Sequence, residues 1–360
     1  MWLLFLLFIY FFLTSKSIYK SNIEFKSNER GHIWIKRKNI FYILIFIFIS
    51  FFSSLRLAKE GTDTYVYLNI FKNIDKYDFS NIEHGYYLLN RIIYFISDNY
   101  QFFLFIVTSI IYLNLYSFLN RYSKHIRISL LLFILLGYFD NSLNLIRQLI
   151  AISIVLYSYK YILSRNFIKF LLIIILASLF HKTSFIFIFA YFLYKIPYKR
   201  NIWKYYIVCL IPIFLVSSYL FDFIQSTGLY GEYFTSSEFG IQDSIKLAPL
   251  LNFIQCFCII ITSLFLLKSN DKKSYFLIVL LMFGSFFTLT SFRFTQIDRL
   301  SFYYSIFTIL LIPNIYINNK KKTTFYYLIF WIVILIMRYL LVSFLRPEWS
   351  GVYPYKFYFL

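Results

Sequence analysis

Apolar runs of roughly the length that crosses a bilayer recur from one end of this 360-residue chain to the other. Hydrophobic residues make up 60% of the sequence and charged residues only 14%, which is too little charge for a soluble domain of this size. We therefore predict an all-α, polytopic integral membrane protein built as a helical bundle. The formal net charge of +20 then indicates lysine-rich cytoplasmic loops rather than a nucleic-acid partner.

The apolar runs predict about twelve spans, at roughly 20 residues each with several shorter. Lysine-rich loops alternate with mixed or acidic loops, so the positive-inside rule predicts that both termini are extracytoplasmic. Two larger extracytoplasmic loops are expected, at about 56–100 and at about 222–247. The first is expected to contain a re-entrant or interfacial helix at 86–96, and a short external turn is expected at 140–142. Nothing divides the chain, so residues 1–360 are expected to form a single domain. The predicted spans cover residues 1–14, 40–55, 102–119, 128–139, 144–165, 170–180, 184–194, 205–221, 249–267, 275–290, 300–317 and 325–345.

The span at 144–165 is unusual because polar residues stand inside its first turns. A polar or small stripe recurs along it at helical spacing, and such a stripe turns away from lipid. Its members are Asn144, Gln148, Ala151, Val155 and Ser158. Arg147 lies in the same turns, where insertion scales assign it a cost of roughly 2.5–3.5 kcal/mol. We predict that it binds an anionic ligand, and the alternative is an arginine that snorkels to the headgroups.

Ionisable residues from several spans and loops fall at or just below the predicted outer surface. They are Asp63, Glu83, Arg147, His181, Arg293, Asp298 and Arg299. The insertion bias opposes arginine in external loops, so we predict that Arg147, Arg293 and Arg299 converge on a lipid phosphate or diphosphate. Helix N-termini on this side also favour anions, and Asn144 and Gln148 are expected as further substrate contacts. The alternative is local ion pairing, in which Asp298 caps its helix and pairs with Arg293.

Two side chains are candidates for a general base, and the sequence leaves the choice between them open. His181 follows an apolar span, and Asp63 lies in a tight turn before a short helix. Each has a simpler alternative, since His181 can contact lipid headgroups and Asp63 can cap the helix. Glu83 and Tyr86 belong to a polar and aromatic cluster of the kind that stacks on sugars, although interfacial aromatics are also ordinary.

Several functional classes lack their sequence signatures. The three cysteines, Cys209, Cys256 and Cys258, stand in apolar runs without a histidine or a second pair nearby, so we expect no metal site. The chain contains no Walker loop, nucleophile elbow or dinucleotide fingerprint, which argues against an ATP-driven pump. No cofactor is expected.

A set of short motifs, taken in order, resembles the EpsG family of bacterial exopolysaccharide-biosynthesis membrane proteins, which is similar to Wzy-type O-antigen and capsule polymerases. The likeness runs over nearly the whole chain, and the order and spacing of the motifs carry it. The motifs are Gly61-Thr62-Asp63-Thr64-Tyr65, Glu83-x-Gly85-Tyr86 with Leu89-Asn90, Asn144-x-x-Arg147-Gln148-x-x-Ala151, Lys169-Phe170, Ala177-x-x-Phe180-His181-x-Thr183 with Ser184, Asp298-Arg299 and Tyr353-Pro354-Tyr355.

The resemblance implies a GT-C-like helical fold and a polymerase of the bacterial cytoplasmic (inner) membrane. Such proteins transfer the growing glycan from undecaprenyl diphosphate to the nonreducing sugar of an incoming lipid-linked repeat unit, at the outer face. The expected partners are therefore this lipid-linked oligosaccharide, the bilayer, and flippase and chain-length regulator proteins. The reaction needs charge stabilisation for the leaving diphosphate, for which Arg147, Arg293 and Arg299 are placed, and a base, for which Asp63 or His181 is available.

Two other functions compete with the polymerase. A flippase of lipid-linked oligosaccharide requires polar residues through the membrane depth, and most spans here are apolar at mid-depth. Arg338, deep in the last span, is the one feature that favours transport. A membrane O-acyltransferase of a surface glycan requires an inward histidine, whereas His181 is predicted to lie outside.

Overall fold

The computed structural model describes residues 37–58, 60–77, 82–199, 201–226, 247–292, 295–319, 321–349 and 351–359. Several predictions fall outside these residues, namely the first span at 1–14, the lysine-rich loop that follows it, most of the external loop at 222–247, and Arg293. The described residues are helical, apart from one isolated antiparallel bridge between Arg56 and Phe357. The all-α prediction is confirmed for this part of the chain.

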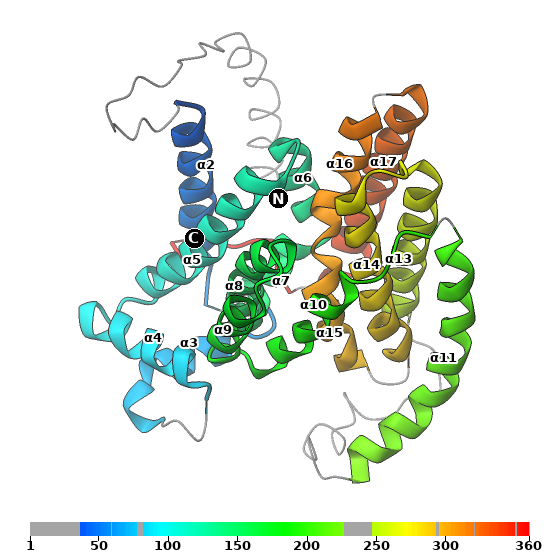
Figure 1. Cartoon of the computed structure of the whole chain (residues 1–360). Coiled ribbons are helices and arrows are strands. Elements are labelled where there is room, and N and C mark those ends of the chain that lie inside the picture. Colours follow the sequence, from blue (N-terminus) through cyan, green and yellow to red (C-terminus); the bar gives the residue numbers. More distant parts are fainter. Residues whose placement is uncertain are drawn as a thin grey trace.

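The N-terminal helices α2–α5 lie on one side of the molecule, α13–α17 lie on the other, and α7–α9 lie between them (Figure 1). The α-helices are α2 (Arg37–Ser54), α3 (Thr64–Lys72), α4 (His84–Ile96), α5 (Tyr100–Tyr122), α6 (Ile126–Leu135), α7 (Tyr138–Asn144), α8 (Ile146–Leu163), α9 (Phe167–Ser178), α10 (Phe189–Leu193), α11 (Ile202–Ser226), α13 (Leu247–Leu266), α14 (Lys272–Thr290), α15 (Asp298–Ser305), α16 (Thr308–Asn319) and α17 (Lys322–Leu345). The 3-10 helices are η1 (Ile74–Lys76), η2 (Lys182–Ile188), η3 (Thr295–Ile297) and η4 (Pro347–Trp349).

Within the described part of the chain, six helical segments are long and apolar enough to cross a membrane, and the bent pair α6–α7 adds a seventh if it counts as one span. These segments are α5, α8, α13, α14, the α15–α16 unit and α17. Four shorter apolar helices lie at 42–54, 167–178, 182–193 and 202–217. Every predicted span within the described residues therefore has a helical counterpart, while the total of about twelve spans remains a prediction.

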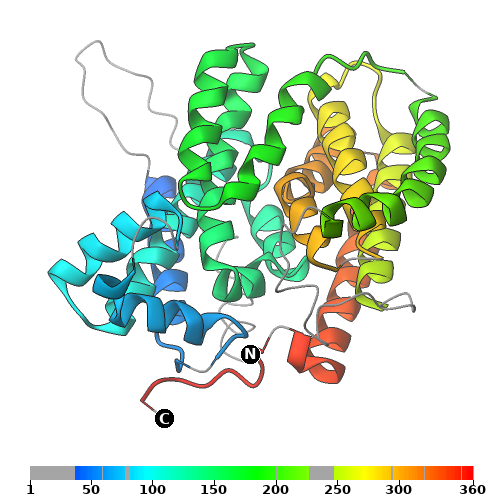
Figure 2. The ribbon, with the colours of Figure 1, turned by 90° about the horizontal axis from the view of Figure 1, so that it is seen from below.

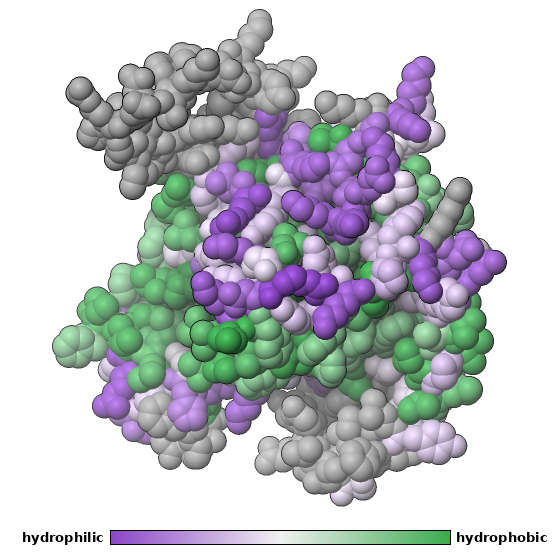
Figure 3. Space-filling view, in the orientation of Figure 1, coloured by the Kyte–Doolittle hydropathy of each residue, from purple (hydrophilic) through white to green (hydrophobic). Residues whose placement is uncertain are grey.

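The central helices and the peripheral helices differ strongly in burial. About three quarters of the apolar window is buried in α8 (72%) and in the α15–α16 unit (78%), against 28% in α13 and 22% in α17. Hydrophilic residues gather over the upper half of one face of the molecule, and hydrophobic residues form a band below them (Figure 3). Such an apolar belt suits a protein whose outer helices face lipid.

The loops meet in two groups that match the predicted alternation. Residues predicted to be cytoplasmic contact one another, because the Lys268 Nζ donates to the Asn318 carbonyl at 2.6 Å and the Tyr275 Oη donates to the Pro197 carbonyl at 2.9 Å. At the other end the C-terminal tail pairs with the segment after α2, and the Gly61 N–H donates to the Gly351 carbonyl at 2.7 Å. The tail and the α3–α4 pair lie along one edge of the molecule in Figure 2, and the α10–α11 connection lies at the opposite edge. Which end faces outward remains a prediction.

One expected turn is wrong, and one expected helix start has moved. Residues 140–142 were predicted as an external turn, but they lie inside α7 and Asp140 is buried. The break comes earlier, at Gly137, which adopts a left-handed conformation (φ 81°), and α6 and α7 meet there at 60°. Asn144 consequently ends α7 instead of opening the next span, and α8 begins at Ile146.

The polar stripe of the span at 144–165 was predicted to turn away from lipid, and the side chains of all five of its members are indeed buried in the protein. The expected interfacial helix at 86–96 also exists as α4, which exposes Leu88, Ile92 and Phe95. Its position relative to the bilayer is untested.

Candidate functional site

The candidate site centres on the carboxylate of Glu83, which contacts two cationic or ionisable side chains from distant parts of the chain. Its Oε2 accepts a hydrogen bond from Arg147 Nη1 at 2.7 Å, and its Oε1 lies 3.1 Å from His181 Nδ1. Glu83 immediately precedes α4, Arg147 lies in the first turn of α8, and His181 stands between α9 and η2. Three elements therefore converge on one carboxylate. The ion pairs among the described residues are these two.

A close backbone contact places Glu83 against the end of α9. The N–H groups of Gly85 and Tyr86 both donate to the Leu179 carbonyl, at 2.7 and 3.3 Å. A Cβ atom at Gly85 would lie only 2.9 Å from that carbonyl oxygen, so the approach requires glycine. These two contacts give a physical reason for glycine two residues after Glu83.

The ionisation of Glu83 determines which ring nitrogen of His181 donates to it. Burial alone would raise the pKa of Glu83, but the hydrogen bond to His181 and the positive charge of Arg147 together lower it to about 2. The carboxylate is therefore ionised at neutral pH and can only accept hydrogen bonds. The Nδ1 of His181 is therefore the donor in this contact, and in a neutral imidazole Nε2 is the nitrogen that can accept a proton.

Two tyrosine rings flank the Arg147 guanidinium. Its Cζ lies 5.8 Å from the ring centroid of Tyr67 and 5.9 Å from that of Tyr86, and the rings pack edge to face. Burial raises the pKa of both phenols. The Oη of Tyr86 and the Nε of Arg147 are buried and lack a hydrogen-bond partner among the described residues. Unsatisfied buried polar atoms of this kind are uncommon in folded proteins.

Arg299 is held beside this cluster through its backbone. The Gln148 Nε2 donates to the Arg299 carbonyl at 2.6 Å, so the first turns of α8 and α15 are joined. The charges of Arg147, Asp63 and Arg299 all act on the Tyr67 phenol. The structure thus brings together two of the three predicted arginines, whereas Arg293 lies outside the described residues.

Asp63 and Asn144 belong to the adjoining turn. Asp63 occupies the N-cap position of α3, but its side chain makes no capping hydrogen bond, so the capping alternative is wrong. Asn144 accepts a hydrogen bond from the Thr62 N–H at 2.8 Å and thereby shapes the turn before Asp63. The same turn needs Gly61, whose φ is 92°. The expected role of Asn144 as a substrate contact stays a prediction.

Asp298 belongs to a different polar network. It accepts from Asn252 Nδ2 at 2.8 Å and from Ser301 Oγ at 3.3 Å. Asn252 in turn accepts from Arg338, which also donates to Gln255 at 2.6 Å. This network joins α13, α15 and α17, and Arg299 follows Asp298 directly in the chain. The alternative in which Asp298 caps its helix does not match these contacts, because they lead to side chains.

Sequence reasoning missed a third polar group, in which a buried carboxylate meets the C-terminal tail. Asp140 accepts from Tyr353 Oη at 2.8 Å and from Tyr339 Oη at 3.4 Å. The only available signal was the Tyr353-Pro354-Tyr355 motif, which had no assigned role. Among the described residues, no three histidine, cysteine, aspartate or glutamate side chains are grouped as metal ligands.

Comparison with known proteins gives one match. A protein-family model described as EpsG family matches residues 39–357, which is nearly the whole chain. No curated protein and no solved structure matches the chain.

Proposed function

This chain belongs to the EpsG family, and from that premise we propose that it polymerises lipid-linked oligosaccharide repeat units into exopolysaccharide, capsule or O-antigen. The donor is the growing glycan on undecaprenyl diphosphate, and the acceptor is the next lipid-linked unit. We place the reaction at the outer face of the bacterial cytoplasmic membrane. Flippase and chain-length regulator proteins, and a GT-C-like fold, belong to the same proposal.

The observation that best supports the proposal is the bridging carboxylate of Glu83. It holds a guanidinium on one side and an imidazole on the other, within reach of a single bound group. Glycan transfer from a diphosphate needs these two functions together, because a negative charge develops on the leaving group while a hydroxyl loses its proton.

The bonds and protons of the step balance as follows. A hydroxyl oxygen of the acceptor's nonreducing sugar attacks the anomeric carbon of the donor glycan and forms the new glycosidic bond. The bond from that carbon to the diphosphate oxygen breaks, and undecaprenyl diphosphate leaves with the electron pair. The hydroxyl proton passes to the Nε2 of His181, whose Nδ1 is hydrogen-bonded to Glu83.

The remaining residues bind or position the substrates. Glu83 accepts a hydrogen bond from one nitrogen of Arg147, and we assign the exposed part of this guanidinium to the phosphate oxygens. Arg299 adds a second charge beside it, held by Gln148. Tyr86 lies against Arg147 and stays in the proposal as a substrate contact. Arg293, Asn144 and Asp298 stay in the proposal as further substrate contacts, and Asp63 as the alternative base.

The test uses the full-length chain in a strain that lacks its own copy, followed by analysis of polymer and glycolipid. Arg147→Ala should abolish long chains and accumulate single-unit glycolipid, with turnover falling on the order of a hundredfold or more. Arg91→Ala is the matched control, because Arg91 is an exposed arginine on α4 that contacts Tyr87 rather than the site. Unchanged polymer in Arg147→Ala, at normal protein level, would overturn the diphosphate role.

A second pair of variants separates the two candidate bases. His181→Gln should abolish polymer while Asp63→Asn retains part of it, because only the histidine is oriented by a carboxylate partner. The opposite result would transfer the role of the base to Asp63.

A flippase is the second candidate function, and Arg338 is the observation that favours it. This arginine lies inside α17, which is long and apolar enough to span a membrane, and it donates to Gln255 and Asn252 of α13. If deletion of the protein traps repeat units on the cytoplasmic leaflet, instead of accumulating them outside, transport replaces polymerisation.

A further inference from the structure

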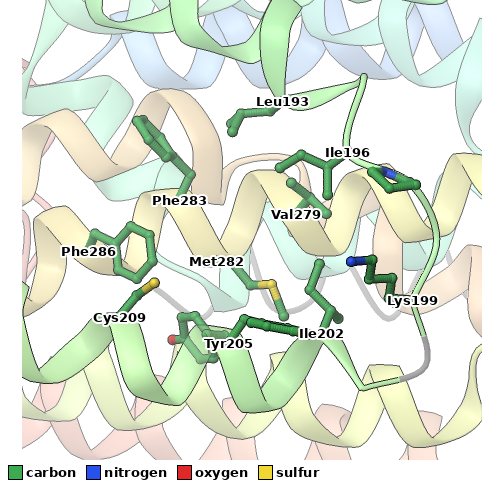
Figure 4. Close-up of a pocket in the computed structure, with 12 residues that line it drawn as sticks. Leu193, Ile196, Lys199, Ile202, Tyr205, Cys209, Val279, Met282, Phe283 and Phe286 are labelled. Carbon is green, nitrogen blue, oxygen red and sulfur yellow. The ribbon is translucent and has the colours of Figure 1, made fainter.

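An apolar cavity of about 300 Å³ lies far from the cluster at Glu83, between α11, α14 and the segment that joins α10 to α11. Figure 4 shows Ile202, Tyr205 and Cys209 on the α11 side and Val279, Met282, Phe283 and Phe286 on the α14 side. Two hydrogen bonds hold the flanking elements in place, from Tyr206 to Ser285 and from Tyr275 to the Pro197 carbonyl. The cavity therefore lies between elements that are anchored to each other.

The cavity adjoins an exposed apolar surface of α11. Beyond it, α11 exposes a row of large apolar side chains, Val208, Ile211, Leu215 and Val216. At its rim, Ile196 and Tyr205 are also exposed. A recess with so few polar atoms gives water nothing to bind, so hydrocarbon is its natural content in a membrane.

A lysine closes one end of the cavity. Lys199 belongs to the lining, and its amino group turns toward Ile202 in Figure 4 and lies 5.5 Å from the Tyr205 ring centroid. Lys195 and Lys204 stand close by in sequence and are exposed, each against an aromatic ring. The ion pairs of the described residues all involve Glu83, so these lysines have no carboxylate partner there. An anionic group complements them.

The cavity and the cluster at Glu83 lie at opposite ends of the bundle. Arg147 is in the first turn of α8, and Arg165, just beyond the other end of α8, packs 4.4 Å from the Tyr194 ring beside the cavity. A helix of 18 residues separates these ends by about 27 Å. The lysines of this end predict the cytoplasmic side.

We propose that this cavity binds an anionic phospholipid of the cytoplasmic leaflet, with an acyl chain between α11 and α14 and its phosphate at Lys199. The site is separate from the glycan site and does not depend on the proposed polymerase activity. Basic recesses between membrane helices on the cytoplasmic side recognise such headgroups.

The experiment reconstitutes the full chain into vesicles with equal parts of phosphatidylglycerol and phosphatidylethanolamine. The protein is then extracted in mild detergent, and the lipids retained per chain are measured by native mass spectrometry. The wild type should retain phosphatidylglycerol in preference, and Lys199→Glu should reduce that preference about fivefold or more, as expected for losing one lysine near a phosphate. Cys209→Trp should reduce total retained lipid, because the indole fills the cavity from an exposed position.

Two matched controls make the result specific. Cys209→Ser keeps the cavity open and should behave as the wild type, and so should Lys272→Glu, which makes the same charge change on an exposed residue outside the lining. The proposal is overturned if Cys209→Trp and Cys209→Ser retain equal lipid, or if Lys199→Glu and Lys272→Glu are indistinguishable. It is likewise overturned if added polyprenyl phosphate displaces the phospholipid from the wild type but not from Cys209→Trp.

Discussion

Glu83 is buried, yet it stays ionised because two partners from other helices contact its two oxygens. A buried, ionised carboxylate without such partners would be strongly destabilising. The contacts that stabilise Glu83 therefore also fix the positions of Arg147 and His181. Arg147 meets this carboxylate through Nη1 and His181 meets it through Nδ1. A single side chain therefore arranges both functional groups of the proposed site.

The stability that Glu83 contributes should depend on pH in a defined direction. Its folded-state pKa is lowered from the ordinary 4.5 to about 2, so its contribution is complete above pH 4.5 and is lost as the pH falls toward 2. The full contribution corresponds to about 3 kcal/mol. Thermal unfolding of wild type and Glu83→Gln in detergent should differ at pH 6 and converge near pH 2. A constant difference across this range would contradict the assignment.

At the scale of elements, helix ends rather than helix faces build the site. The start of α4 is bonded to the end of α9, and the first turns of α8 and α15 are bonded to each other. Close approach at the first junction depends on Gly85, and the second depends on the Gln148 amide.

Gly85→Ala should disturb the first junction. The added Cβ would lie 2.9 Å from the Leu179 carbonyl oxygen, so α4 must move and Glu83 must move with it. We expect a stability loss of about 1–3 kcal/mol and reduced polymer at normal protein level. Leu88→Ala on the exposed face of the same helix should change neither quantity much. Normal polymer in Gly85→Ala would show that the junction does not position the site.

The network of Asp298, Asn252 and Arg338 should hold α15 and thereby Arg299. Asn252→Leu removes the link between the aspartate and the arginine, and we expect a cost of about 1–2 kcal/mol with less polymer formed. Gln255→Leu, which removes one contact of Arg338 and leaves Asp298 bonded, should cost less. Unfolding temperatures and polymer yield compare the two, and equal effects would argue against positioning through Asp298.

At the scale of the whole molecule, the two ends of the described chain are joined. The C-terminal tail bonds to the segment after α2, and this segment leads directly into the turn that holds Asp63. Beneath the tail lies Arg56, which is fully buried and donates to the Ser53 and Leu143 carbonyls. The tail thus covers the buried charge of Arg56, and its hydrogen bonds hold the segment that leads to Asp63.

Truncation after Trp349 should expose that charge. The tail contributes three backbone hydrogen bonds to residues 55–61, and their loss alone corresponds to about 3 kcal/mol. We expect a lower unfolding temperature and loss of polymer. Removal of Phe359 and Leu360 alone should have little effect, since Phe359 is exposed. A truncated chain as stable and active as the wild type would show that the tail is dispensable.

Local chemistry explains why much of this was predictable. Apolar length and low charge determined a helical membrane protein, and the alternation of loop charge predicted which loops meet. The cost of an arginine inside a span pointed to Arg147, and the predicted outer position of Glu83 and His181 pointed to those two, before any contact was known. The polar stripe at 144–165 also indicated its buried face.

Only the tertiary structure decided which of these residues touch. Glu83 contacts Arg147 across 64 positions of the chain and His181 across 98. Asp298 accepts from Asn252, 46 positions away, rather than from a helix end, and Tyr353 donates to Asp140 across 213 positions. The type of a residue and the hydropathy period of its segment can be read from the sequence alone. Its partner depends on how whole helices pack, and on a left-handed glycine such as Gly137 that redirects a helix without changing its hydropathy.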